Sequence, residues 1–387
     1  MEQAIDQIKA IAAKADRQGQ QHLMSVLHQL AYSMEDPDDT LNRCSRMPLE
    51  SATIMIGHDL GLFKYLTSQD GVSIQDIADK TGAEVGLLNR VVRYLAAIGA
   101  VDESSLGQIT ANKVTQNLST DAVAAGMYHA FHTIGPQYQA LPSFLKRTGY
   151  KDPTNELQTP FQDAWNTPLD AFSWFSEQPD HLAYFNDFMA LRRQPETSWL
   201  SVYPVREKIK GSNPDRPVYV NIGGGIGHQC VQFKNAFPDI PGRVILQDLP
   251  HTISQALSHP EVENMACDFY QPQPITGATF YFMRGVLHDH PPHLVSEILK
   301  NTKAAMAPDS ILLVDEMILP ETGVSAPSAA VDMTMLAARG GMERTERQWC
   351  QTFQDAGLEL VKTYTYNPAS YESVMEVCLA QDDAVSA

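Results

Sequence analysis

The chain has 387 residues and a formal net charge of −18, with 28 Lys and Arg against 46 Asp and Glu. This acidity argues against binding to nucleic acid or to an anionic membrane, because both require clustered positive charge. The segment Met1 to Lys14 carries charges in place of an apolar signal core, and no stretch resembles a membrane span. Five scattered cysteines lack paired metal spacing, which predicts reduced, mostly buried thiols and no metal site. We expect a soluble cytoplasmic protein that binds a neutral or cationic small molecule.

The first third of the chain is predicted to be helical. Apolar residues at helical spacing indicate one or two helices over residues 3–32. An irregular segment at Asp36–Asp39 is expected next, and then a further helix over about Leu49–Leu66.

A helix-turn-helix with a small hairpin follows. Ser73 is a plausible N-cap, Gly82 can end the first helix, and a second helix is expected over residues 84–98. The strand-like runs 100–103 and 106–110 can form a wing. The second helix has only Arg90 and Arg93 as basic residues, so we interpret this winged helix as structural or dimer-forming and not as a DNA reader.

Residues 122–200 read as helical and are rich in aromatic and histidine side chains. Most of these side chains are typical of a core, but some can line an apolar pocket for a flat organic substrate. His129 and His132 lie one helical turn apart, either as an interhelical hydrogen-bonded pair or as substrate contacts. The pair Arg192-Arg193 is either a solvated helix end or an anchor for a substrate oxygen.

From Val218 the pattern changes to alternating strands and helices. The run Val218 to Gly227 is an apolar strand that ends in four glycines, before a helix over His228–Phe237. Glycines let the backbone turn and let a ligand approach, which is typical of a nucleotide-cofactor cradle, although an ordinary βα turn has the same pattern. Asp248 ends the second strand, about 20 residues past the glycines, where a carboxylate can accept ribose hydroxyls.

Further polar residues follow the next strands. Asp268 and Phe269 end a short third strand and can contact a base. His288 lies beyond the fourth strand and can take a proton from an acidic hydroxyl near neutral pH. Glu316 and Glu343 can fix its tautomer, although a capping histidine and solvated carboxylates are the simpler interpretation of each residue alone. Two strand-like runs, 359–366 and 373–380, predict a hairpin at the edge of the sheet.

Together these motifs resemble the S-adenosylmethionine-dependent O-methyltransferases of the plant caffeate and flavonoid type and their fungal secondary-metabolism relatives. The matching stretches, in chain order, are Val220–Gly227, Asp248-Leu249-Pro250, Asp268-Phe269, Arg284, His288-Asp289-His290 and Gly340–Thr345. The resemblance runs from the winged helix to the C-terminal hairpin.

The resemblance implies an α/β fold: a Rossmann-like class I methyltransferase sheet with an N-terminal, mainly helical, winged-helix dimerisation domain. It implies three regions, namely a helical and winged-helix domain (1–120), an aromatic substrate-pocket and linker region (121–205) and a catalytic domain that binds S-adenosylmethionine (206–387). A homodimer acting on a small molecule is expected.

The resemblance also assigns roles to residues. The general base falls on His288, flanked by Glu316 and Glu343. The cofactor contacts fall on Gly223, Gly225, Asp248, Leu249, Asp268, Phe269 and Arg284. The residues expected to contact the substrate are His129, His132, Met189, Arg193, Asp332, Met333 and Leu336.

Three departures from the family pattern keep a second activity open. Asn221 replaces the usual acidic residue before the glycines, His290 replaces a tryptophan, and Pro291-Pro292 follow it. Some fungal proteins with this fold are pericyclases or dehydratases that rearrange polyketide-alkaloid intermediates without consuming the cofactor, and the extra histidines suit that use. The presence of His288, Glu316 and Glu343 favours methyl transfer. A catalytically silent binder is a third possibility, since a fold does not settle a reaction.

Overall fold

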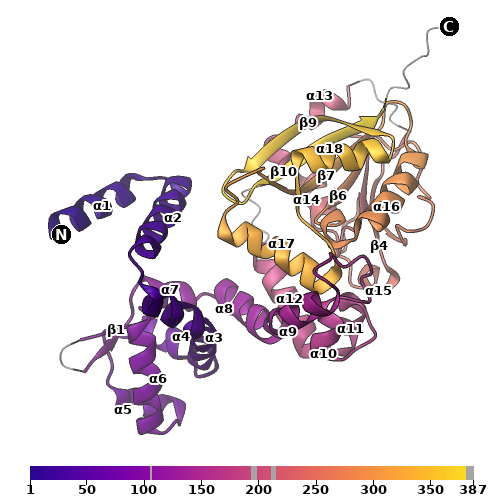
Figure 1. Cartoon of the computed structure of the whole chain (residues 1–387). Coiled ribbons are helices and arrows are strands. Elements are labelled where there is room, and N and C mark those ends of the chain that lie inside the picture. The colour runs from indigo at the N-terminus through magenta and orange to yellow at the C-terminus, as the bar shows by residue number, and fades with distance from the viewer. Residues whose placement is uncertain (105–106, 193–197, 211–214, 381–387) are drawn as a thin grey trace. The chain divides into compact units, whose positions relative to one another are not determined.

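The computed structural model describes residues 1–104, 107–192, 198–210 and 215–380 (Figure 1). The chain forms two compact units. The first contains Met1–Gln139 and Phe172–Gln194, and the second contains Ala140–Ala171 and Pro195–Ala387. The predicted pocket and linker region, 121–205, contains residues of both units.

The described part of the first unit is almost entirely helical. Its elements are α1 (Glu2–Lys14), α2 (Arg17–Ser33), α3 (Pro37–Asp59), α4 (Leu62–Thr67), α5 (Ile74–Thr81), α6 (Val85–Ala97), α7 (Lys113–Leu118), α8 (Asp121–Tyr128), the π-helix η1 (His129–Ile134), the start of α9 (Gly135–Arg147), most of α11 (Ala171–Glu177), α12 (Pro179–Arg192) and the short strands β1 (Asp102–Glu103) and β2 (Ile109–Thr110).

The helix expected from about Leu49 begins much earlier, so that prediction is wrong. Asp36 caps α3 by accepting a hydrogen bond from the Asp39 N–H, and Asp39 accepts one from the Asp36 N–H in return. Pro37 occupies the first helical position, where no backbone donor is needed. The segment predicted to be irregular is therefore a helix start.

The helix pair after residue 72 matches its prediction closely. Ser73 caps α5 through the Asp76 N–H, and Gly82 ends the helix with a φ of +74°. Strands β1 and β2 pair antiparallel. These elements share one core, which includes Leu62, Phe63, Ile77, Leu88, Leu95 and Ile109. The winged-helix assignment itself stays a prediction.

The second unit is built on an eight-stranded sheet with the order β5-β4-β3-β6-β7-β10-β9, in which β8 pairs only with β7. Its strands are β3 (Tyr219–Ile222), β4 (Val244–Asp248), β5 (Val262–Ala266), β6 (Phe280–Arg284), β7 (Ile311–Leu319), β8 (Arg344–Thr345), β9 (Leu358–Asn367) and β10 (Glu372–Leu379). The strands from β5 to β7 in this order run parallel, and the C-terminal pair β9–β10 is antiparallel, as expected. The sheet therefore has the predicted arrangement of parallel strands with an antiparallel hairpin at one edge.

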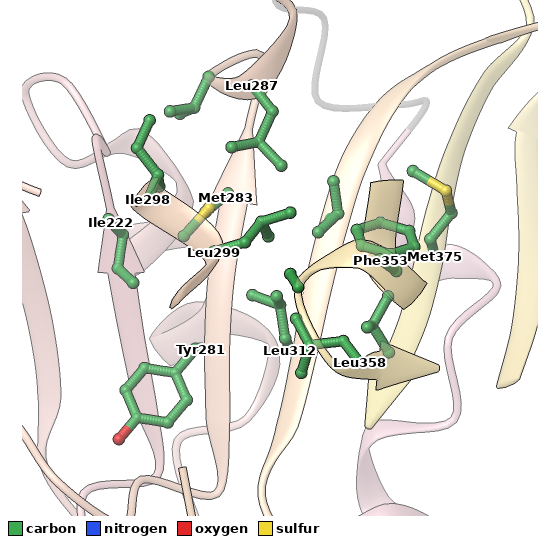
Figure 2. Packing of buried hydrophobic residues seen from close by; sticks show 14 of the residues in the cluster. Ile222, Tyr281, Met283, Leu287, Ile298, Leu299, Leu312, Phe353, Leu358 and Met375 are labelled. Atoms are coloured by element: carbon green, nitrogen blue, oxygen red, sulfur yellow. The ribbon is translucent and has the colours of Figure 1, made fainter. Parts of the chain in front are cut away.

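Helices cover both faces of this sheet. On one face, α16 (Pro292–Ala305) and α18 (Glu346–Asp355) bury Ile298, Leu299 and Phe353 against the strands (Figure 2). On the other face, α14 (His228–Ala236) and the short helices η2 (Trp199–Ser201) and α13 (Val205–Lys208) pack around Trp199 and Phe233. The other helices in the described part of the unit are the end of α9, α10 (Pro160–Trp165), α15 (Pro250–Ile253), η3 (Leu287–Asp289) and α17 (Ala326–Arg339). The near-continuous apolar strands are typical of a sheet buried on both sides.

No helix in the described ranges is long and apolar enough to cross a membrane. All five cysteines are free thiols. Only Cys230 is buried, whereas Cys44 is exposed and the other three are half-buried, so the expectation of mostly buried thiols is wrong.

Candidate active site

The candidate site lies at the carboxyl ends of β3 and β6, where the strand order reverses. Neighbouring strands β3 and β6 are far apart in the sequence, and α/β sheets bind ligands in the crevice that forms at such a point. A Cβ atom added to Gly223 would lie 2.9 Å from Val286 Cγ2 and 3.6 Å from Phe269 Cε1. Gly223 also has a φ of +64°, so both space and backbone favour glycine here. The glycine turn therefore lies directly against the loops after β5 and β6.

Asp248, at the end of β4, faces the glycine turn. Its two carboxylate oxygens accept hydrogen bonds from the N–H groups of Gly225 and Leu249, each at 2.8 Å. Asp268 Oδ1 accepts from the Tyr270 N–H at 3.0 Å, which shapes the turn that carries Phe269. The structure thus brings the predicted cofactor residues of β3, β4 and β5 to one edge of the sheet.

Arg284 is held by carboxylates that the sequence analysis did not assign to it. Its Nε lies 3.3 Å from Asp315 Oδ2, and an Nη atom lies 4.0 Å from Glu372 Oε1. Tyr366 donates a hydrogen bond to Asp315 at 2.8 Å. Burial raises the pKa of Asp315 to about 7, against the opposing effect of Arg284. Arg284 is therefore a fixed positive charge at the end of β6.

Asn221, the departure before the glycines, is 1% exposed. Among the described residues its Nδ2 atom has no hydrogen-bond partner. Burial raises the pKa of the neighbouring Cys230 thiol to about 12, against the opposing effect of Asn221. A side chain on Gly224 would overlap the Asn221 amide. A glycine cradle, a buried polar atom without a partner and a carboxylate at the end of β4 fit a nucleoside cofactor with an amino-acid end.

His288 lies on η3, the turn after β6. Its Nδ1 is 2.6 Å from Glu343 Oε1 and 3.9 Å from Glu316 Oε2. The imidazole is 20% exposed, whereas the side chains of Glu316 and Glu343 are at most 1% exposed. Its Nε2 is 3.7 Å from Asp289 Oδ1, too far for a hydrogen bond, and has no hydrogen-bond partner within the described part of the chain.

Backbone contacts hold the two carboxylates in place. Glu316, on β7, accepts hydrogen bonds from the N–H groups of Val286 and Leu287 at 3.1 and 2.9 Å. The Glu343 N–H donates to Asp332 Oδ1 at 2.8 Å. The bonds to Glu316 tie the turn that carries His288 to β7, and the bond to Asp332 ties the loop that carries Glu343 to α17.

The electrostatics of this cluster favour a protonated imidazole. Burial lowers the pKa of His288, but Glu316, Asp289 and Glu343 outweigh it and raise the pKa from 6.5 to about 10. Burial also raises the pKa of Glu316, to about 7, and His288 opposes this rise. A proton taken up by His288 is therefore strongly stabilised.

Atoms of His288, Glu316 and Glu343 that could bind a metal ion lie within 4.8 Å of one another. The short hydrogen bond between His288 and Glu343 already occupies one ring nitrogen and one carboxylate oxygen. A proton lies in this bond, between His288 and Glu343.

The residues predicted to contact the substrate are divided between the units. His129, His132 and Met189 belong to the first unit, whereas Asp332, Met333 and Leu336 lie on α17 in the second. Asp332 holds the Glu343 backbone, Met333 is 41% exposed and Leu336 is half-buried. Arg193 lies outside the described residues. A common substrate site for these residues stays a prediction.

His129 is a buried, neutral histidine. It lies on η1, and π-helical turns are frequent at functional sites. Phe175, Phe185 and Phe188 surround its ring at centroid distances of 5.6 to 6.4 Å. Burial lowers its pKa to about 4, and its Nδ1 has no hydrogen-bond partner in the described ranges. His132 instead stacks with Tyr128 and Tyr184.

Sequence reasoning missed a group of buried and half-buried polar side chains around Arg339. Its members come from five separate places in the chain: Glu156, Asp170, Tyr270, His290 and Arg339. The only signal in the sequence was His290, which stood out as a departure from the family pattern.

Comparison with known proteins identifies the family to which the chain belongs. The model of the O-methyltransferase domain family matches residues 150–359. The chain is 36% identical over 365 residues to the O-methyltransferase LepI of Aspergillus flavus, covering 93% of this chain and 94% of that one. It is also 36% identical over 369 residues to the demethylsterigmatocystin 6-O-methyltransferase of Aspergillus parasiticus, covering 95% of each chain.

Solved structures show the same similarity. A structure of LepI in complex with S-adenosylmethionine superimposes with a TM-score of 0.88 at 35% identity, covering 97% of this chain and 98% of that one. A structure described as a pericyclic reaction enzyme matches with the same figures. The chain belongs to the O-methyltransferase family, has the class I methyltransferase fold and takes S-adenosylmethionine as its cofactor.

Proposed function

We propose that the protein transfers a methyl group from S-adenosylmethionine to a hydroxyl of a small aromatic or polyketide-type secondary metabolite, with His288 as general base. The observation that carries the proposal is the 2.6 Å contact between His288 Nδ1 and Glu343 Oε1. With Nδ1–H donated to Glu343, the lone pair of Nε2 is available on the partly exposed side of the ring.

The residues of the chain supply positioning and proton transfer. His288 Nε2 takes the hydroxyl proton as the substrate oxygen forms its bond to the methyl carbon. Glu343 and Glu316 stabilise the imidazolium that results. The bound cofactor supplies the methyl group on a positively charged sulfur. General base catalysis of this kind typically contributes about 10²- to 10⁴-fold in rate.

The raised pKa of His288 implies that the cofactor binds before His288 gives up its proton. Without ligand the imidazole holds its proton at neutral pH, because three carboxylates face it. His288 releases that proton more readily when a sulfonium cation is bound at the neighbouring glycine turn, since like charges repel. Cofactor binding therefore prepares the base.

Other roles follow from the same family likeness. We assign cofactor binding to Gly223, Gly225, Asp248, Leu249, Asp268, Phe269 and Arg284, and substrate contacts to His129, His132, Met189, Arg193, Asp332, Met333 and Leu336. Location in the cytoplasm stays a prediction.

A panel of phenolic and polyketide acceptors tests the proposal. With S-adenosylmethionine we expect a methylated product and S-adenosylhomocysteine in equal amounts. His288→Ala should abolish both, whereas His293→Ala, which changes an exposed histidine at the start of α16, should change neither. Methyl transfer that survives in His288→Ala would rule out the assigned base.

A second function is supported by specific observations. LepI and a structure described as a pericyclic reaction enzyme share this fold, and His129 offers a neutral imidazole inside an aromatic cluster. In this alternative the protein isomerises or cyclises a polyketide-alkaloid intermediate while the bound cofactor is not consumed. A product of unchanged mass, without S-adenosylhomocysteine, would establish it.

We further propose that the functional form is a homodimer. Helices α1 and α2 contain no buried residue, yet apolar side chains such as Ile11 and Leu30 are 58% and 54% exposed. Apolar helix faces of this kind are stabilised by a second apolar surface, and a second copy of the chain offers the same faces.

A further inference from the structure

Beside the candidate site lies a group of polar side chains, of which His290 and Arg339 are buried and the others half-buried. It connects Phe269-Tyr270, here called the cofactor loop, with the turn that carries His288. His290 is 4% exposed, and its Nδ1 lies 2.9 Å from the Tyr270 hydroxyl and 3.5 Å from an Arg339 guanidinium nitrogen. The His290 Nδ1 atom is also 3.6 Å from Glu156 Oε2. Arg339 also contacts Glu156 and Asp170, each at 3.2 Å. All of these residues belong to the second unit.

His290 also contacts Phe269, whose ring is assigned to cofactor binding. Its imidazole meets the Phe269 ring edge-on, with a centroid distance of 5.4 Å and an interplanar angle of 74°. Phe269 in turn faces Gly223 of the glycine turn. His290 therefore touches the loop after β5 through both Phe269 and Tyr270.

On its other side the group holds the backbone of η3. Arg339 Nε donates a hydrogen bond to the Asp289 carbonyl at 3.3 Å, between His288 and His290. The Tyr270 O–H can donate to Nδ1 of His290, Arg339 faces the same atom as a second donor, and the Glu156 carboxylate faces it as an acceptor. A tryptophan, which has no acceptor, would leave the Tyr270 hydroxyl without this partner.

We propose that His290 is a positioning residue: it couples the cofactor loop at Phe269-Tyr270 to the orientation of His288. The assignment rests on the proposed function, because it concerns the base of that reaction. A cofactor that orders Phe269 and Tyr270 orders His290, and through η3 it fixes the imidazole of His288 against Glu343. The two loops then act as one element, although they follow different strands of the sheet, β5 and β6.

The test compares His290→Phe, which keeps the ring but removes Nδ1, with His290→Asn, whose amide oxygen can replace Nδ1 as the acceptor. His293→Phe is the matched control at an exposed position. Affinity for S-adenosylhomocysteine is measured by calorimetry, and the imidazole signals of His288 are followed by NMR of ¹⁵N-histidine-labelled protein. The His288 signals are identified by their absence in His288→Ala.

We expect His290→Phe to weaken S-adenosylhomocysteine binding about five- to tenfold, as for one lost hydrogen bond. It should also shift or broaden the Nδ1–H signal of His288, and His290→Asn should restore both properties. Tyr270→Phe should have the same effect, and the double variant should be no worse than either single variant, because both remove one contact. His290→Phe protein that is folded by thermal melting, but has unchanged affinity or an unchanged His288 signal, would overturn the proposal.

These readouts do not depend on turnover. If the protein methylates no tested acceptor but His290→Phe shows the expected shift of the His288 signal, the result would support the coupling and contradict the proposed reaction. Conversely, if His290→Phe transfers the methyl group with unaltered kcat and cofactor KM, the result would support the reaction and contradict the coupling.

Discussion

Gly341 lies against the backbone of His288. A Cβ atom at Gly341 would overlap the His288 carbonyl oxygen and lie 2.8 Å from the Asp289 carbonyl carbon. The next residue, Met342, donates its N–H to the same His288 oxygen at 3.0 Å. The turn that delivers Glu343 is therefore packed directly on the turn that carries the imidazole, with room only for glycine.

Gly341→Ala should move Glu343 away from His288, because the added methyl group pushes apart the two turns that carry them. We expect kcat to fall about 100-fold, because small misplacements of catalytic groups have effects of this size, and the unfolding free energy to fall by about 1–3 kcal/mol from overpacking. Affinity for S-adenosylhomocysteine should stay unchanged. Gly19→Ala, in the first turn of α2, is the matched control and should retain full activity. Normal kcat in Gly341→Ala would show that the contact is not needed.

Glu343→Gln should weaken the base without removing the imidazole. The charged hydrogen bond at 2.6 Å becomes a neutral one, and the amide can present a donor to Nδ1, which favours the wrong tautomer. We expect kcat to fall about 100-fold or more while acceptor KM changes little. Steady-state kinetics of purified protein check this, and a drop confined to KM would instead place Glu343 in substrate binding.

The sequence predicted the parts of this site that depend on local pattern. The glycine turn and the carboxylate after β4 follow from the alternation of strands and turns, and the structure brings them to one edge. The start of α3 was missed because the Asp36-Pro37 capping signal resembles a turn in isolation. The contact between Arg339 and Glu156 joins residues 183 positions apart, and no local periodicity marks such a pair.

The stability of the folded protein should decrease as the pH rises. The folded-state pKa values of Glu316 and His288 both lie above their ordinary values of 4.5 and 6.5. The folded state therefore binds more protons than the unfolded state, and the stabilisation present at low pH is lost as pH rises through about 7 for Glu316 and about 10 for His288.

Glu316→Gln tests this directly. It removes one raised pKa and also lowers that of His288, because Glu316 is the strongest of the carboxylates that favour the imidazolium. Thermal midpoints of the variant should decline less than those of the wild type between about pH 5 and pH 10. NMR titration should show His288 losing its proton at a lower pH than in the wild type. Identical His288 titrations in the two proteins would contradict the assigned coupling.

Asn221→Asp should restore the acidic residue expected before the glycines. A carboxylate here can pair with the ammonium of the cofactor's methionine end, so we expect affinity for S-adenosylmethionine to rise about tenfold. Without ligand the variant should melt earlier, because residue 221 is 1% exposed and a buried charge without a partner is costly. Calorimetry and melting curves with and without cofactor measure both effects. Tighter binding without the loss of unliganded stability would mean that the introduced carboxylate finds a partner in the protein itself.

The exposed apolar faces of α1 and α2 predict the oligomeric state. Light scattering after size exclusion should give twice the mass of a single chain for the wild type. Ile11→Asp combined with Leu30→Asp should shift the protein towards the monomer, because each change places a charge on an apolar face that the partner would cover. Gln7→Asp introduces the same charge at an exposed polar position of α1 and should leave the dimer intact. A wild-type protein that stays monomeric at micromolar concentration would remove the dimer from the proposal, whereas a dimer unaffected by the paired substitutions would place its interface on other helices.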